Sequence, residues 1–274
     1  MRKGFVLSIV FAFIFAIVLG TVLSYSDKAS EGELLKAGDP TLKKAFVRDD
    51  IAFDLKQLMG VNVSIEKTAS STEVSFADST PSNLSNPSQE ETDYIDFAEG
   101  DYADATNSEI SLNPSPQIIV SPAGLTYSYS GWGKDSVTLE GEADELIVVA
   151  RINDSCATDC STATTYSWKW ASSGLKVKLD LRDANGAQIM VNGSTSGFVD
   201  PSESNLLSVA LAGGGSFDLS TGGSSQPKLS FSSDAPTLVN TTAVLPGTSP
   251  ATVSVDAGLV IDGESYEYLP ILQK

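Results

Sequence analysis

The chain has 274 residues, and 41% of them are hydrophobic, which is enough for a packed core and argues against a disordered chain. Its formal net charge of -18 disfavours nucleic acid and anionic lipid headgroups as partners, because both are negatively charged. The absence of histidine excludes Ser-His-Asp and Cys-His catalytic systems and the histidine-containing metal sites. We therefore predict neither an enzyme nor a bound metal or cofactor.

The first element in chain order is an uncharged apolar run from Phe5 to Leu23. As a helix it would be about 28 Å long, close to the ~30 Å hydrocarbon thickness of a bilayer and longer than the apolar region of a secretory signal. Arg2 and Lys3 precede the run and acidic residues follow it, so the positive-inside rule places the N-terminus in the cytoplasm. The sequence predicts a single-pass membrane protein with an extracytoplasmic body, in which residues 5–38 are the transmembrane helix and its extension.

Small side chains recur at every fourth position of this run and form one stripe. They are Ser8, Ala12, Ala16 and Gly20. Such stripes allow two helices to approach closely in lipid, although small residues are also common in single membrane anchors. We interpret the stripe as a helix-packing face.

The start of the chain, "RKGF" followed at once by the apolar run, resembles the class III signal of archaeal type IV pilins and pilin-like surface proteins. The resemblance implies that residues 1–4 are a leader and that a prepilin peptidase cuts between Gly4 and Phe5. It also implies that the retained helix packs with copies of itself, or with other pilin-like subunits, in a surface filament. In that family a β-rich head faces outward.

Residues 39–107 are predicted to contain a helix, a hairpin and an acidic segment. Asp39 and Pro40 are typical of a helix start and Gly60 of a helix end. A core-facing stripe lies between them, at Val47, Ile51, Leu55 and Leu58. The alternation in "VNVSIEKTASSTEVSF" then predicts a β-hairpin with a polar turn.

The acidic segment carries seven acids and no base between Glu90 and Asp104, and a short helix with Asn86 as its cap and Pro87 at its first position fits its apolar spacing. A calcium site is conceivable there. The spacing matches no D-x-D-x-D-G loop, however, so we favour a solvated helix face.

From residue 108 to residue 274 the chain consists of short alternating segments separated by Gly, Pro, Asn and Asp. The clearest hairpin signal is Asn185-Gly186, which joins "LKVKLDLRD" to a second apolar segment. This pattern predicts a mainly antiparallel β-sandwich head. The predicted fold class is therefore α+β, with an N-terminal transmembrane helix and extension followed by the head.

Two kinds of side chain in the predicted body suggest covalent modification. Cys156 and Cys160 lie in a short loop on the exported side, where a disulfide is favoured over a metal or redox pair. N-x-S/T sequons make five asparagines candidates for glycosylation, namely Asn62, Asn83, Asn153, Asn192 and Asn240. Chance is an alternative origin for the sequons, because Ser and Thr are abundant.

Three functions fit these features. The leading prediction is a pilin-like single-pass surface protein, structural or adhesive, that assembles through its helix. The first alternative is a monomeric membrane-anchored binding module for a glycan or protein ligand, with an aromatic platform built from Tyr127, Tyr129, Trp132, Tyr166, Trp168 and Trp170. The second alternative is an anchored two-carboxylate hydrolase, although no pair of acids stands out.

Overall fold

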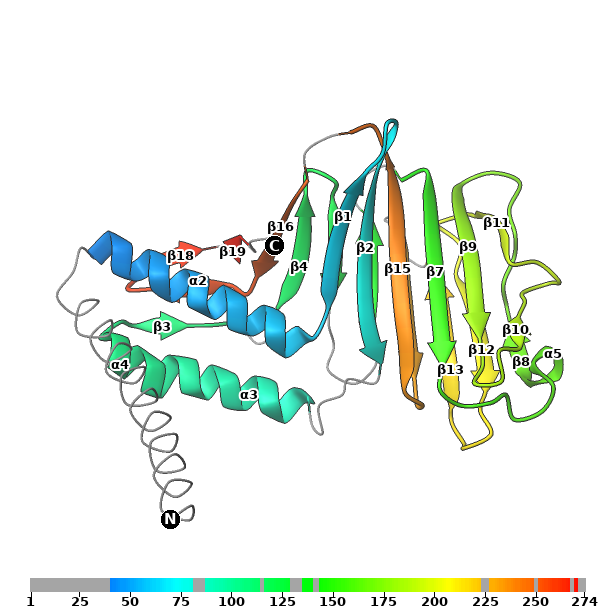
Figure 1. Ribbon diagram of the computed structural model, residues 1–274, viewed down its shortest axis with the longest axis horizontal. Helices are drawn as coiled ribbons and strands as arrows, with labels where there is room; N and C mark the ends of the chain where they lie inside the picture. The colour runs from blue at the N-terminus through cyan, green and yellow to red at the C-terminus, as the bar shows by residue number, and fades with distance from the viewer. Residues whose placement is uncertain are drawn as a thin grey trace, which may run out of the picture.

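The computed structural model describes residues 40–80, 87–113, 116–128, 135–139, 143–222, 227–248, 251–266 and 269–270. The helical elements in this part of the chain are α2 (Pro40–Met59), α3 (Pro87–Phe97), the π-helical turn η1 (Ala98–Tyr102), α4 (Ala103–Thr106) and α5 (Cys160–Ala163). Most of the remaining described residues belong to three β-sheets, shown in Figure 1.

Each sheet combines strands that are distant in the sequence. The first sheet has the spatial order β1 (Asn62–Lys67), β2 (Ser71–Thr80), β15 (Thr237–Pro246), β7 (Glu145–Ile152), β9 (Leu175–Arg182) and β10 (Gln188–Ile189), with β11 (Ser196–Val199) also paired to β9. The second sheet has the order β19 (Leu269–Pro270), β16 (Thr252–Asp256), β4 (Gln117–Ser121), β5 (Leu125–Ser128), β6 (Asp135–Leu139), β14 (Lys228–Ser233), β13 (Ser216–Thr221), β12 (Asn205–Ala210) and β8 (Thr164–Tyr166). The third sheet is β18 (Glu264–Tyr266), β17 (Leu259–Ile261) and β3 (Ile110–Ser111).

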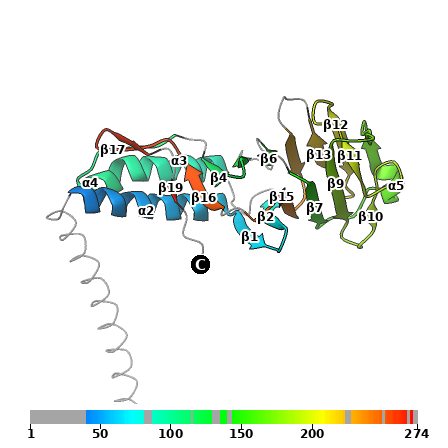
Figure 2. The same ribbon diagram turned by 90° about the horizontal axis from the view of Figure 1, so that it is seen from above.

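The first and second sheets pack face to face, as Figures 1 and 2 show. The ring of Phe76 on β2 stacks on the ring of Tyr127 on β5, with centroids 5.3 Å apart. Both side chains are almost fully buried, and strict alternation of buried and outward residues along β7 and β15 places one face of each strand in the same core. The described strand pairs are antiparallel except β7 with β9, which are parallel.

α2, α3 and α4 lie at one end of the molecule, beside the third sheet, and α5 lies at the other end (Figures 1 and 2). α2 follows the predicted helix, begins at Pro40 and ends just before Gly60, whose φ of 69° is typical of a residue that terminates a helix. It buries Val47, Ile51 and Leu55 and contacts β16, β17 and β19. The second helical segment, from α3 to α4, is tied to α2 by a hydrogen bond of 2.8 Å from the Tyr102 hydroxyl to Asp50.

The predicted α+β fold class, with a membrane-spanning helix and a single-pass membrane location, is wrong for the described residues. None of the helices among them has both the length and the apolar composition needed to cross a membrane. The longest, α2, carries charged side chains along its length, including Lys44, Arg48 and Asp54. The described residues are mainly in β-sheet. Residues 5–23, on which the prediction of a membrane-spanning helix rested, lie outside the described residues.

The predicted hairpin at residues 61–76 is confirmed as β1 and β2, paired in register from Asn62 with Ala77 to Lys67 with Thr72. The sequence assigned this hairpin to the segment before the head. In the structure β2 pairs along its whole length with β15, so the hairpin supplies two strands of the first sheet.

Candidate functional site

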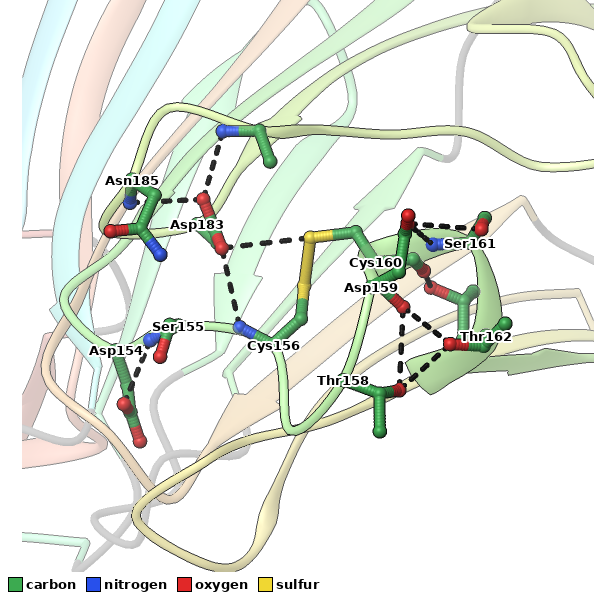
Figure 3. The surroundings of a disulfide bond; sticks show 12 residues. Asp154, Ser155, Cys156, Thr158, Asp159, Cys160, Ser161, Thr162, Asp183 and Asn185 are labelled. Carbon is green, nitrogen blue, oxygen red and sulfur yellow. Dashed lines mark hydrogen bonds between the residues drawn. A yellow bond between two sulfur atoms is a disulfide. The ribbon is translucent and has the colours of Figure 1, made fainter.

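The predicted pairing of Cys156 with Cys160 is present in the structure, where the two Sγ atoms are 2.07 Å apart (Figure 3). The bond closes the loop that leaves β7, and α5 follows at once, with the Asp159 side chain accepting from the backbone N–H of Ser161 at 3.0 Å. This loop lies at the end of the molecule opposite α3 and α4 (Figure 1).

Asp183, at the end of β9, connects the disulfide loop to the next hairpin. Its Oδ1 atom accepts from the backbone N–H groups of Asn185 at 3.0 Å and Ala187 at 2.8 Å, and its Oδ2 atom accepts from the backbone N–H of Cys156 at 3.2 Å (Figure 3). The loop also reaches the second sheet, because the backbone N–H of Ala157 donates to the Ala210 oxygen at 2.9 Å. We call Cys156, Cys160 and Asp183 the disulfide hub, since they join hairpins of both sheets.

The alternative of a metal site at the two cysteines can be tested by their geometry. Both sulfur atoms and a carboxylate oxygen of Asp183 lie within 4.8 Å of one another, a spacing that suits a metal ion. The sulfur atoms are bonded to each other, however, and metal ligation by cysteine requires thiolates. In the oxidised form the disulfide hub therefore stabilises the loop and is not a metal site.

A groove of about 570 Å³ opens beside the disulfide hub, where the C-terminal ends of β2, β7 and β9 lie in the first sheet. Its lining includes Ser79, Arg151, Arg182, Ala184, Pro236 and Leu238. Leu238, which is 62% exposed, contributes an apolar side chain to this lining. A neighbouring hollow of about 300 Å³ shares Ser79, Arg151 and Leu238, which extends the same surface over the outer face of the sheet.

Two arginines in the groove share one carboxylate. Arg151 donates from Nη1 to the backbone oxygen of Asp180 at 2.7 Å and forms an ion pair with its Oδ2 atom, while Nε of Arg182 donates to Oδ1 at 3.0 Å. The hydrogen bond from Arg151 is the largest cause that holds the pKa of Asp180 below its usual value, and Arg182 acts in the same direction. Ion pairs this exposed contribute only about 0–1 kcal/mol to stability. Their main effect is to fix the direction of the two guanidinium groups.

The outward positions of β7 and β9 carry four bases, Arg151, Lys176, Lys178 and Arg182, and two acids, Glu145 and Asp180. Lys176 and Lys178 both form ion pairs with Glu145, at 3.2 and 3.0 Å, at the opposite end of the two strands from Arg151 and Arg182. The groove itself is lined by two bases, Arg151 and Arg182, and one acid, Asp183. In a chain of net charge -18, this part of the surface favours anionic groups over the rest of the molecule.

A pair of acids that the sequence did not single out lies between the two main sheets. Asp78 on β2 is 8% exposed and hydrogen-bonds to the side chain of Asp135 on β6, which is 1% exposed. The Tyr127 hydroxyl donates to Oδ2 of Asp78 at 2.5 Å. Two carboxyl groups can form a hydrogen bond only when one of them holds a proton. Their burial in the core makes the pair a poor fit to a two-carboxylate hydrolase, whose acids flank a bound sugar.

Between pH 4 and pH 7 the Asp78→Asn variant is expected to gain stability relative to the natural chain, by an amount on the order of 1 kcal/mol. Burial raises the pKa of Asp78 above its ordinary value of 3.8, and the hydrogen bonds from Tyr127, the backbone N–H of Ser79 and Asp135 offset this only in part. The folded state therefore binds a proton more tightly than the unfolded state. Stability falls as the pH rises from the unfolded pKa through the folded pKa.

Asparagine cannot ionise. It keeps one oxygen, which accepts from Tyr127, while its NH2 group replaces the oxygen that accepts from the Ser79 N–H. Urea denaturation at several pH values measures the effect. We expect the stability of the variant relative to the natural chain to be constant below pH 4 and to rise above it. If the natural chain gains more stability than the variant between pH 4 and 7, the pKa of Asp78 is not raised in the folded state.

The aromatic platform suggested by the sequence does not form from the described side chains. Tyr127 is fully buried against Phe76, and Trp168 is 3% exposed. Trp170 packs on Trp168 with ring centroids 5.6 Å apart, and its Nε1 donates to the Val191 oxygen at 3.0 Å. Tyr129 and Trp132 lie outside the described residues, and Tyr166 alone of the described set is strongly exposed, at 45%.

The other predicted site residues divide into two groups. Gly4, Phe5 and the stripe of Ser8, Ala12, Ala16 and Gly20 lie outside the described residues, as does Asn83. The remaining sequon asparagines are exposed, at Asn62, Asn153, Asn192 and Asn240. The Asn192 amide already donates to the Trp168 oxygen at 2.8 Å. Asn153 lines the groove and Asn240 lines the neighbouring hollow, so a glycan on either would cover this surface.

The two arginines were missed as a site because each looks ordinary in its own strand. Arg151 and Arg182 both occupy outward positions of an alternating pattern, where a charged residue needs no explanation. Only the parallel pairing of β7 with β9 places Arg151 opposite Arg182.

Comparison of the chain with family models, with curated proteins and with solved structures finds no match in any of the three.

Proposed function

We propose that the chain is a pilin-like protein with a structural or adhesive function, whose β-sheet body makes contacts and catalyses no reaction. The observation that carries the proposal is the groove, because a sheet holds exposed Leu238 and two guanidinium groups in a fixed arrangement. Sites built on strands are more precise than sites on loops. The disulfide hub also supports the proposal, since disulfides are typical of proteins that work in an oxidising environment.

The N-terminal sequence supports the pilin-like part of the proposal. Arg2, Lys3 and Gly4 precede the apolar run that begins at Phe5 and resemble a class III signal, so a prepilin peptidase is the processing partner we propose. The partners in assembly are then further copies of this chain or other pilin-like subunits.

A second candidate is a monomeric binding module for a glycan or a protein. It is favoured by the fact that a single chain forms the whole groove, so a second copy is not needed to complete the binding surface.

The native N-terminus tests the leading proposal. Mass spectrometry of the protein purified from its own cells should show a chain that begins at Phe5. A Gly4→Leu variant is the matched control, and it should retain Met1, because the peptidase of this family cuts after a small residue. A natural chain with Met1 intact, or one that begins near Ser26, would contradict the pilin-like proposal and leave the binding module.

A further inference from the structure

The helical end of the molecule carries a surface that is opposite in charge to the groove. Phe97, the last residue of α3, has a side chain that is 48% exposed. Asp93 and Asp101 lie one turn before and after it, and Asp96 is its neighbour; all three acids are exposed. We call Asp93, Asp96, Phe97 and Asp101 the acidic knob.

The aromatic ring of the acidic knob has a fixed position although it faces solvent. Its centroid lies 6.5 Å from that of Tyr94 and 6.0 Å from that of Tyr102. The Tyr102 hydroxyl is in turn hydrogen-bonded to Asp50 of α2. An exposed aromatic side chain that is held in this way loses little conformational freedom when a partner covers it.

The acidic knob and the groove are complementary in both of their components. The knob presents one apolar ring surrounded by acids, and the segment from Glu90 to Asp104 contains seven acids and no base. The groove presents the exposed side chain of Leu238 beside two bases, Arg151 and Arg182, and its lining contains one acid, Asp183. A buried aromatic anchor with charged pairs at its edge is a common arrangement in protein interfaces.

We infer that the groove binds the acidic knob of a second copy of this chain, with Phe97 on Leu238 and the neighbouring aspartates facing Arg151 and Arg182. The inference rests on the proposed function, because it names the surfaces through which pilin-like copies contact one another. The net negative charge of two copies does not prevent the contact, since the Debye length at physiological salt is about 8 Å and repulsion between distant charges is screened.

The positions of the two surfaces determine the kind of assembly. The acidic knob is on α3 and η1, at the end of the molecule that holds the third sheet, whereas β7, β9 and β15, which line the groove, lie away from that end (Figures 1 and 2). One surface of each copy therefore contacts a different surface of the next copy. A pair of copies that makes this contact once keeps a free knob and a free groove and can extend into an open chain or a ring, whereas a pair that makes it twice about a two-fold axis is a closed dimer.

Cysteine cross-linking of the full chain tests the contact. A Phe97→Cys variant and a Leu238→Cys variant are mixed and oxidised, and the linked peptides are identified by mass spectrometry. We expect about tenfold more cross-linked dimer than from two control mixtures, because the contact raises the effective concentration of the two thiols. One control replaces Phe97→Cys by Phe53→Cys, which is 59% exposed on α2, and the other replaces Leu238→Cys by Leu206→Cys, which is 44% exposed on β12.

Charge reversal tests the recognition. Arg182→Glu on the Leu238→Cys copy should lower the yield by about tenfold, because it places like charges opposite each other. Asp96→Lys on the Phe97→Cys copy should then restore most of the yield. The proposed contact would be wrong if the yield of cross-linked dimer equalled that of the controls, or if the Arg182→Glu change left this yield unaltered.

The remaining outcomes are also decisive. Polygalacturonate, an anionic polysaccharide, is the probe for a ligand other than this chain. If it binds the full chain, if the Arg182→Glu change abolishes that binding, and if no cross-link forms, then the groove binds an anionic ligand and the contact between copies is wrong. A failed cross-link together with a native N-terminus at Phe5 would reject this contact and leave the pilin-like proposal standing.

Discussion

Replacing Phe76 by alanine is expected to lower the free energy of unfolding by about 3–5 kcal/mol. Phe76 is 1% exposed, lies on β2 in the interior of the first sheet and stacks on Tyr127 of the second. The change removes the buried ring and leaves a cavity between two sheets that cannot close without moving strands. It also removes the ring that supports Tyr127, whose hydroxyl donates to Asp78.

Urea denaturation of the full chain, followed by circular dichroism, measures this effect. Phe53→Ala is the matched control, because it removes the same ring from a position that is 59% exposed. The control should change stability by no more than about 0.5 kcal/mol, as is usual for surface substitutions. Equal effects of the two variants would show that the face-to-face packing of the sheets is not the main source of stability.

The sequence was most informative where the structure depends on neighbours along the chain. α2 begins at Pro40 and ends before Gly60, as capping preferences predict, and the turn at Asn185-Gly186 joins β9 to β10. Gly186 has a φ of 79°, which glycine adopts without the strain that a side chain would cause. These features are decided by a few adjacent residues, so propensity and spacing were enough to find them.

The sequence was least informative about contacts between distant strands. β2 pairs with β15 across more than 150 residues of chain, and no local pattern indicates that partner. The parallel pairing of β7 with β9 is equally invisible, and with it the shared position of Arg151, Asp180 and Arg182. Tertiary contacts of this kind decide which strands share a sheet, and they place the predicted hairpin, β1 and β2, in the same sheet as β7 and β9.

The buried acids show an intermediate case. Asp78 follows Val74 and Phe76 at every second position, and that spacing alone places its side chain on the inner face of β2. A charged residue on an inner face requires a partner. The pattern could therefore have shown that Asp78 needs one, but only the packing of the second sheet identifies Tyr127 and Asp135.

The disulfide hub is expected to depend more on its carboxylate than on its covalent bond. Asp183→Ala should lower the free energy of unfolding by about 4–5 kcal/mol, because three backbone N–H groups lose a charged acceptor and each hydrogen bond to a charged group contributes at least about 1.5 kcal/mol. The three donors are those of Cys156, Asn185 and Ala187. Asp183 itself is 7% exposed, so water can replace the lost acceptor only in part.

Removing the disulfide by the double change Cys156→Ser and Cys160→Ser should cost less, about 2 kcal/mol, because the chain-entropy model gives little for so short a ring. The loop would keep its other bonds, such as the one from the Ala157 N–H to the Ala210 oxygen. Urea denaturation of both variants measures the order of the two effects, and Asp183→Asn, which retains an uncharged acceptor, should lie between Asp183→Ala and the natural chain. A larger loss from the cysteine changes than from Asp183→Ala would mean that the covalent bond, and not the carboxylate, positions the wall of the groove.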